Sequence, residues 1–385
     1  MDFATLRAAF SFPTAIRFGA GALSQLPAAC RALAISRPLI VTDRGLAAAG
    51  FIADAAGLLG GAPVFAEVKG NPDDANVAAG AAAARQGGHD GIVAIGGGSA
   101  IDAAKAIAAA TRHRGSLWDF DFAGSAWKKI EGAGILPLVA VPTTAGTGSE
   151  VGRGAVIIDR ARAVKVVLLH ARMLPGQVIL DPRLTCGLPP GLTAWTGLDA
   201  LAHCLEAYCV DAFHPMADGI AAEGARLIKE YLPRAVADGS DLAARGHLLV
   251  AASMGATAFQ KGLGGVHALA HPIGARHDVH HGLTNAVLMP YVLIHNRPAI
   301  EERIGRLAAY LGLAPGFPAF LDWLLGLRAA LGIPHDLAGL GLAGADHELL
   351  ARDAAADVSA ATNPLPLDAA SLRRILAAAL EGNLR

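Results

Sequence analysis

The feature that most constrains the fold of this chain is an alternation of short apolar runs with alanine-rich helical segments over residues 38–110. The runs at 37–43 and 90–95 are rich in branched aliphatic residues, which is typical of strands buried on both faces of a parallel sheet. Helices between such strands pack on either side of the sheet. The order therefore predicts a doubly wound parallel α/β sheet, in which ligands bind at the carboxyl ends of the strands.

A glycine cluster directly follows the run at 90–95. Gly96, Gly97, Gly98 and Ser99 lead into a helical pattern that continues through Lys105. Glycines let a backbone approach an anion closely, and the free amides at a helix start supply donors and a favourable dipole for a pyrophosphate. Because the spacing is not GxGxxG, a tight strand-to-helix connection is the alternative interpretation.

Two further features bear on a nucleotide. Asp43 ends the first apolar run, where a carboxylate can accept both hydroxyls of an adenosine ribose and repel a 2'-phosphate, so it favours NAD over NADP. Its alternative role is to cap the following helix. The tract TTAGTGSE at 143–150 is either a plain loop or a set of nucleotide contacts, and its position relative to the glycine cluster decides between them.

A histidine-rich tract points to a metal. Five of the fourteen histidines lie between His267 and His281. His267 and His271 are four residues apart and share one helix face, and Pro272 is expected to end that helix. Asp199 and His203 show the same spacing upstream. Two such pairs can converge on one ion, whereas a solvated histidine-rich loop is the alternative.

Length and composition narrow the class of protein. At 385 residues the chain can form two domains. Its 32 basic and 33 acidic residues are balanced, which makes nucleic acid and acidic membrane poor candidates for a partner and favours a small molecule. There is no apolar run of about 20 residues to span a membrane and no secretory signal pattern in residues 1–15. Four cysteines without CxxC spacing suit a reducing cytoplasm.

The character of the sequence changes after Pro182 to alanine- and leucine-rich helical stretches. We therefore expect an α/β nucleotide-binding domain over 1–182 and an all-α domain over 183–385. Helices are expected near 192–211, 216–236, 241–260 and 264–271. The runs 155–158 and 178–181 are expected to form a strand pair with Lys165 between them.

Four segments together resemble the iron-dependent (group III) alcohol dehydrogenases in order and spacing: GGGSAIDAAK at 96–105, TTAGTGSE at 143–150, the segment 181–208 and the segment 267–290. The resemblance covers nearly the whole chain. It implies the two-domain fold shared with glycerol dehydrogenase and dehydroquinate synthase, an α/β NAD-binding domain followed by a helical metal-binding domain. It also implies hydride transfer between a small primary alcohol or diol and NAD, with an aldehyde or ketone product. Separately, we expect a homodimer or higher homo-oligomer.

The resemblance assigns residues to each part of this chemistry. The implied metal ligands are Asp199, His203, His267 and His281, a set that suits Fe(II) or Zn(II), with Fe(II) favoured by the family. His280 stands where the family commonly has a proline, and the fourteen-residue spacing from His267 favours His281 over it. His271 would relay the hydroxyl proton, or alternatively support a neighbouring ligand. The implied cofactor contacts are Asp43, Asn71, Gly97, Gly98, Ser99, Thr143, Thr144, Lys165 and Leu184.

Three other functions compete with this one. A metal-independent reductase of unsaturated oxo-acids, similar to maleylacetate reductase, would not need the complete four-ligand set. A hydroxyacid-oxoacid transhydrogenase would pass hydride through tightly held NAD. A non-enzymatic scaffold or sensor that binds NAD and metal would predict a lost ligand or a blocked glycine loop, and the sequence shows neither.

Overall fold

The computed structural model describes residues 10–162 and 164–384. Tertiary contacts divide the chain into two compact units, one of residues 14–197 and 234–253 and the other of residues 10–13, 198–233 and 254–384. The expected domain boundary after residue 182 stays a proposal. It divides the sequence into two continuous stretches, whereas each contact-based unit is made of more than one separate segment. Residues 1–9, on which the prediction about a secretory signal partly depends, lie outside the described residues.

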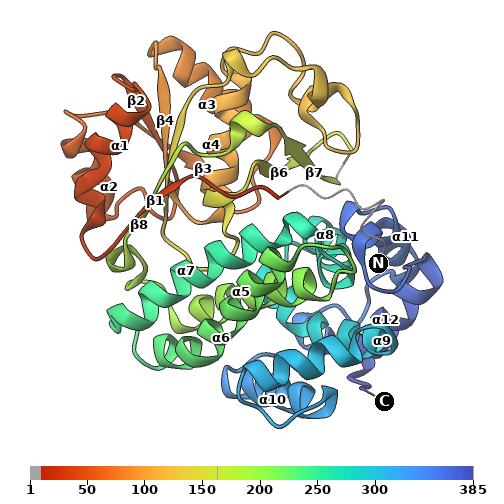
Figure 1. Ribbon diagram of the computed structural model, residues 1–385. Coiled ribbons are helices and arrows are strands. Elements are labelled where there is room, and N and C mark those ends of the chain that lie inside the picture. The colour runs from red at the N-terminus through yellow and green to blue at the C-terminus, as the bar shows by residue number, and fades with distance from the viewer. Residues whose placement is uncertain (1–9, 163, 385) are drawn as a thin grey trace, which may run out of the picture. The chain divides into compact units, whose positions relative to one another are not determined.

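The first unit is built on a six-stranded parallel sheet with the order β1-β8-β5-β4-β2-β3 (Figure 1). The strands are β1 (Ala15–Phe18), β2 (Pro38–Asp43), β3 (Val64–Val68), β4 (Gly91–Gly96), β5 (Leu138–Pro142) and β8 (Gln177–Leu180). Crossover helices connect β2, β3 and β4, as parallel pairing requires. The predicted doubly wound α/β sheet is confirmed.

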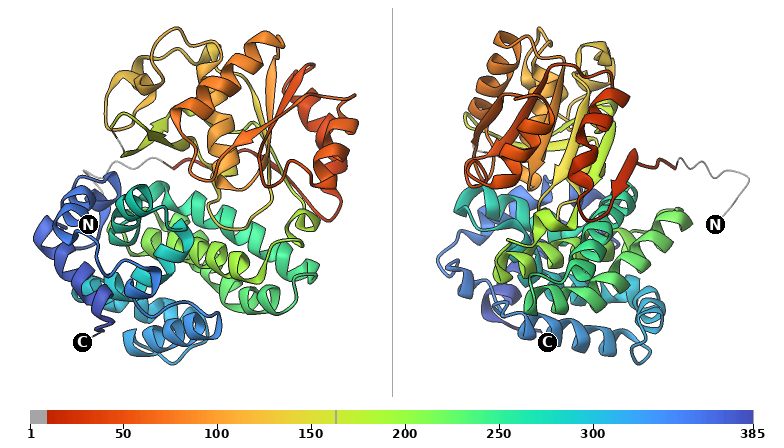
Figure 2. Two further views of the ribbon diagram at one scale, coloured as in Figure 1. Left: turned by 180° about the vertical axis from the view of Figure 1, so that it is seen from behind. Right: turned by 90° about the vertical axis from the view of Figure 1, so that its left-hand side faces the viewer.

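Both faces of this sheet are buried. Along β2, Leu39 and Val41 join one apolar cluster while Ile40 joins the other, because successive side chains of a strand point to opposite faces. Helices α1 (Leu26–Ala32) and α2 (Gly50–Leu58) cover one face, and α3 (Asp74–Gln86) and α4 (Gly98–Ala110) cover the other (Figures 1 and 2). Burying each large aliphatic side chain contributes about 1.5 to 3 kcal/mol.

The predicted strand pair was wrong in its partners. Strand β6 (Gly154–Asp159) pairs antiparallel with β7 (Val164–Leu169), and β8 instead joins the main sheet between β1 and β5. Lys165 therefore lies within β7, opposite Ile158. An apolar run predicts a strand but not the partner of that strand. Here β6 pairs with β7, the next run along the chain, which follows it after a short turn.

The rest of the chain is helical, with α5 (Pro190–Cys209), α6 (Pro215–Ala237), α7 (Leu242–Ala258), α8 (Gly265–His277), α9 (His281–Tyr310), α10 (Phe317–Ala330), α11 (His347–Ala355) and α12 (Ala369–Glu381). By contacts, residues 190–197 and 234–253 of these helices belong to the first unit and the others to the second, helical unit. The expected end of a helix at Pro272 was wrong, because α8 continues through it to His277. Proline removes one backbone bond, and burial of α8 from Gly265 to Gly274 outweighs that loss. Among the described helices, none is long and apolar enough to cross a membrane.

Candidate metal centre

Helix α5 presents the first half of the candidate centre. Asp199 and His203 lie one turn apart on the same face of α5, and both are buried, with 2% and 5% of their surface exposed. One ligand atom each from Asp199, His203 and His267 lies within 4.8 Å of the others. The i, i+4 spacing seen in the sequence thus becomes a shared face that points toward α8.

Helices α8 and α9 supply the second half. His267 comes from the first turn of α8, and its ring stacks on that of His203 with centroids 4.6 Å apart. His281 is the first residue of α9, and its Nε2 lies 3.6 Å from Oδ1 of Asp199. His280 instead serves as the N-cap of α9, accepting the amide of Leu283 at 3.4 Å. The geometry therefore brings His281, rather than His280, to Asp199.

The acceptor atoms of this cluster meet at one side chain. Asn285 lies one turn after His281, and its Nδ2 is 2.7 Å from Oδ1 of Asp199, 3.1 Å from Nε2 of His281 and 3.3 Å from Nε2 of His267. An amide nitrogen has only two hydrogens, so it cannot satisfy three acceptors at once. A carboxylate and imidazoles that converge in a buried site form a donor set that suits a divalent transition metal.

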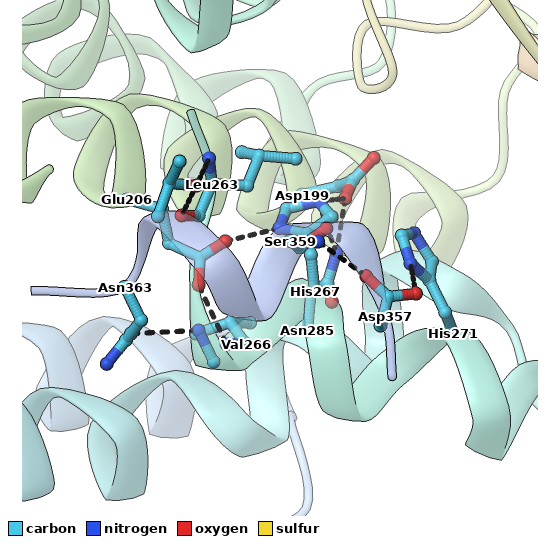
Figure 3. A network of polar contacts seen from close by, with 12 residues as sticks. Asp199, Glu206, Leu263, Val266, His267, His271, Asn285, Asp357, Ser359 and Asn363 are labelled. Carbon is cyan, nitrogen blue, oxygen red and sulfur yellow. Dashed lines mark hydrogen bonds and ion pairs between the residues drawn. The ribbon is translucent and has the colours of Figure 1, made fainter. Parts of the chain in front are cut away.

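Glu206 stands behind His267 and escaped the sequence analysis. It lies on α5, its Oε2 is 2.5 Å from Nδ1 of His267, and Figure 3 shows the pair. Burial disfavours the protonated imidazole, but the carboxylates of Glu206 and Asp199 outweigh it and raise the pKa of His267. A signal was available, because Glu206 follows Asp199 by seven residues and so shares its helix face.

His271 has a similar partner. Its Nδ1 lies 2.8 Å from Oδ2 of Asp357 (Figure 3). Its ring is nearly parallel to that of His281, at 11° with centroids 5.5 Å apart. Burial opposes ionisation of Asp357, yet the charge and hydrogen bond of His271 hold its pKa below the usual range. The two residues are 86 positions apart, so no local pattern in the sequence connects them.

In the α/β unit, Asp43 lies at the end of β2 beside the glycine cluster that follows β4. Its Oδ1 accepts the amide of Leu46 at 3.1 Å in the turn after the strand. It does not cap the following helix α2, whose N-cap residue is Ala49, so that alternative was wrong. A Cβ built on Gly96 would lie 3.2 Å from its Oδ2, which shows how closely the carboxylate approaches the cluster. The adjacent positions of β2 and β4 in the sheet bring these two features together.

The hydroxyl-rich tract packs against the glycine cluster. A Cβ on Gly98 would lie 2.5 Å from Cγ2 of Thr147, and one on Gly97 would lie 3.4 Å from the Thr144 side chain. Gly97 is the N-cap of α4 and makes no side-chain capping bond, and Ser99 lies in the first turn. Thr143 donates its amide to the Gly96 carbonyl at 3.0 Å. The tract therefore lies directly beside the glycine cluster.

The remaining expected cofactor contacts are spread over the same unit. Asn71 adopts a left-handed backbone, with φ of 50°, in the turn before α3. Leu184 packs against the apolar cluster that includes α1 and α2. Lys165 lies close enough to Asp102 for its charge to act on that carboxylate.

Asp102 belongs to a second buried polar cluster centred on Lys105. The Lys105 side chain is fully buried, and its Nζ donates to the Ser149 carbonyl (2.6 Å), the Ser149 hydroxyl (2.8 Å) and the Gly154 carbonyl (2.8 Å). The Ser149 hydroxyl in turn donates to Asp102, whose other oxygen accepts the amide of Val156. Burial lowers the pKa of Lys105 to about 8 and raises that of Asp102.

Comparison with known proteins places this geometry in a family. Residues 13–182 match the family model described as iron-containing alcohol dehydrogenase, and residues 193–380 match that of the Fe-containing alcohol dehydrogenase family, C-terminal. The chain is 42% identical over 381 residues to 4-hydroxybutyrate dehydrogenase of Cupriavidus necator, covering 94% of this chain and 97% of that protein. It is 37% identical over 366 residues to 1,3-propanediol dehydrogenase of Citrobacter freundii, covering 90% and 92%.

Solved structures agree. A structure of 1,3-propanediol oxidoreductase superposes with a TM-score of 0.90 at 35% identity, covering 97% of this chain and all of that one. Sulfoacetaldehyde reductase from Bifidobacterium kashiwanohense, solved in complex with NAD+, superposes with a TM-score of 0.89 at 29% identity, covering 97% and 99%.

Proposed function

Because this chain belongs to the iron-containing alcohol dehydrogenase family, we propose that it transfers a hydride between a small primary alcohol or diol and NAD, with an aldehyde or ketone as product. The observation that carries this proposal is the convergence of one carboxylate and three imidazoles from α5, α8 and α9. The metal-independent reductase activity would leave that convergence without a purpose.

The proposed metal ligands are Asp199, His203, His267 and His281. Fe(II) is favoured by the family, and Zn(II) fits the same donor set. When bound, such an ion supplies Lewis-acid chemistry that polarises an alcohol oxygen. The chain supplies the rest: α5 and α8 bury two of the ligands, Asp199 and His267, to 2% exposure, and this burial excludes water from their side of the site.

The proposed cofactor site lies in the α/β unit. Asp43 would accept the adenosine ribose hydroxyls, and the start of α4 at Gly97, Gly98 and Ser99 would donate amides to the pyrophosphate. The other proposed contacts are Asn71, Thr143, Thr144, Lys165 and Leu184. The close packing of Gly98 on Thr147 supports this arrangement, since it holds the hydroxyl-rich tract against the helix start.

His271 is proposed to receive the alcohol proton at Nε2 and pass it outward. Its Nδ1 faces Asp357, so that carboxylate would orient the ring and stabilise the protonated imidazole. The alternative role, support of a neighbouring ligand, draws on its stacking against His281. A His271→Gln variant separates the two, because a relay role lowers turnover with metal retained, whereas a supporting role lowers metal retention.

The substrate class follows from the relatives. They include proteins named for 4-hydroxybutyrate, methanol and 1,3-propanediol, all short molecules that carry a primary hydroxyl. We further propose a homodimer or higher oligomer in the cytoplasm, where the four free cysteines would stay reduced. Light scattering of the purified protein would test the oligomeric state.

The decisive experiment is metal analysis of anaerobically purified protein, coupled to NAD reduction with methanol, 1,3-propanediol and 4-hydroxybutyrate before and after chelation. We expect about one Fe or Zn per chain, as a single four-ligand site binds one ion, and turnover that is lost on chelation and restored by the metal. Full activity after complete metal removal would instead indicate a metal-independent reductase. Bound NAD that survives purification and exchanges slowly would indicate the transhydrogenase.

Cofactor choice has its own test. Asp43→Gly removes the carboxylate that would repel a 2'-phosphate, so NADP should begin to compete with NAD. The ratio of kcat/KM for the two cofactors measures this, and an unchanged ratio would remove the ribose role from Asp43.

A further inference from the structure

Glu206 is a buried carboxylate directly behind His267, a proposed metal ligand. It is 7% exposed, and it faces α8 from the same side of α5 as Asp199 (Figure 3). A buried carboxylate is costly unless it is hydrogen-bonded on both oxygens. The partners of its two oxygens therefore indicate the role of Glu206.

Both oxygens of Glu206 bind the first turn of α8. Oε1 accepts the backbone amide of Val266 at 2.7 Å, and Oε2 lies 2.5 Å from Nδ1 of His267. The N-cap residue of α8 is Gly264, which makes no side-chain capping bond. Since the first amides of a helix lack partners within it, Glu206 replaces the missing cap from another helix.

The approach of Glu206 depends on the small residue at the N-cap. A Cβ built on Gly264 would lie 3.1 Å from Oε1 of Glu206 and 2.7 Å from Oδ1 of Asn363. Asn363 accepts the neighbouring amide of Gly265 at 3.0 Å. The start of α8 is thus held by two side chains from distant parts of the sequence, and the position of His267 is set with it.

A carboxylate can only accept a hydrogen, so its bond to His267 places the imidazole proton on Nδ1. Nε2 then carries the lone pair, and this is the atom that faces Oδ1 of Asp199 at 4.0 Å. A carboxylate on the far nitrogen of a ligating histidine fixes its tautomer and ring orientation and makes it a stronger ligand.

We propose that Glu206 is a positioning residue of the metal centre, which holds His267 as an Nε2 ligand while capping the helix that carries it. This inference rests on the proposed function, because it needs a metal at the cluster formed by Asp199, His203, His267 and His281, the Asp199 cluster. Glu206 itself touches neither the metal nor the substrate.

The test is Glu206→Gln. The carboxylate uses a different oxygen for Val266 and for His267, and an amide replaces one of those oxygens with a donating NH2 group, so it cannot reproduce both bonds. We expect the affinity for Zn(II), measured by competition with a chelator, to fall by about 10- to 100-fold. The matched control is Asp357→Asn, which makes the same change behind His271 on the same helix. It should leave Zn(II) affinity unchanged within error.

A second measurement does not depend on any variant folding. In the Zn-loaded wild-type protein with 15N-labelled histidine, NMR should show His267 protonated at Nδ1 and metal-bound through Nε2. Metal bound through Nδ1 would overturn the inference. In folded Asp357→Asn protein this Nδ1–H signal should persist, whereas Glu206→Gln should shift or lose it.

The outcomes separate this inference from the proposed function. Tight metal binding by the wild type with equal affinity in Glu206→Gln would overturn the role of Glu206 and leave the dehydrogenase intact. A wild-type protein that binds no metal would overturn both. Loss of affinity in both Glu206→Gln and Asp357→Asn would also count against Glu206, because it would show a general sensitivity of α8.

Discussion

Two buried polar clusters, the Lys105 cluster of the α/β unit and the Asp199 cluster of the helical unit, differ in how their donors and acceptors match. The three hydrogens of Lys105 Nζ meet three oxygens, and Asp102 is satisfied by Ser149 and Val156. In the Asp199 cluster, one carboxylate oxygen and two imidazole nitrogens converge on the single amide nitrogen of Asn285, whose two hydrogens can meet at most two of them.

The balance of donors and acceptors therefore distinguishes a structural cluster from a functional one. A network whose donors and acceptors are balanced among its own members holds the fold together and needs nothing from outside. A buried network with surplus acceptors is completed by a cation. Removing a member should therefore cost stability in the first cluster and chemistry in the second, which the following predictions test.

The largest effect is expected for His267→Ala. Loss of a ligand should remove the metal, whose Lewis-acid contribution of several kcal/mol corresponds to at least about a 1,000-fold loss of turnover. NAD binding should persist, because the proposed cofactor contacts belong to the other unit. Steady-state kinetics with metal analysis, and fluorescence titration with NAD, measure the two. Lost NAD binding with full metal retention would refute the assignment.

Next in size is Lys105→Met. This variant leaves the Ser149 and Gly154 carbonyls without the Lys105 donor and removes a cation 4.0 Å from the Asp102 carboxylate. It should lower the free energy of unfolding by about 3 to 5 kcal/mol, as measured by chemical denaturation. Lys69→Met is the matched control, because Lys69 also pairs with an aspartate in this unit, at 3.5 Å, but is 55% exposed. Its cost should be under about 1 kcal/mol. Equal costs would mean that Lys105 is not a structural centre.

Gly98→Ala should weaken NAD binding and leave the metal in place, the opposite of what we expect for His267→Ala. The added Cβ would lie 2.5 Å from Thr147, so the loop must shift, at a cost of about 1 to 3 kcal/mol. We expect NAD affinity to fall about tenfold, the free-energy equivalent of 1.4 kcal/mol, with metal content unchanged. Gly97→Ala, with 3.4 Å of space, should have a smaller effect. A larger effect at Gly97 would contradict the packing argument.

Stability should also depend on pH through Lys105. Burial lowers the pKa of Lys105 to about 8 from an ordinary 10.5. Between these values the unfolded chain binds more protons than the folded one, so the contribution of Lys105 to stability should rise with pH, by at most about 1.4 kcal/mol per unit. Below pH 8 both states are protonated and the contribution should be constant. Chemical denaturation from pH 7 to 10 measures the difference in free energy of unfolding between wild type and Lys105→Met. This difference should grow with pH, and a decrease would contradict the prediction.

Much of the fold was predictable because its signals are local. Apolar runs followed by glycines and helices predicted the doubly wound sheet, and the structure confirms it. The pairing of β6 with β7 was not predictable, since a run of aliphatic residues carries no record of its partner. Nor was the passage of α8 through Pro272, where burial of the helix decided the outcome.

For the candidate site, the sequence was enough to predict which side chains share one face of a helix. Asp199 and His203 are four residues apart, and so are His267 and His271. The roles of the proposed ligands and cofactor contacts stay predictions. Only the tertiary structure decided that Glu206 reaches His267, that Asp357 reaches His271, and that Asn285 lies among the acceptors. Helix periodicity sets where a side chain points, but the packing of one helix on another sets what it meets.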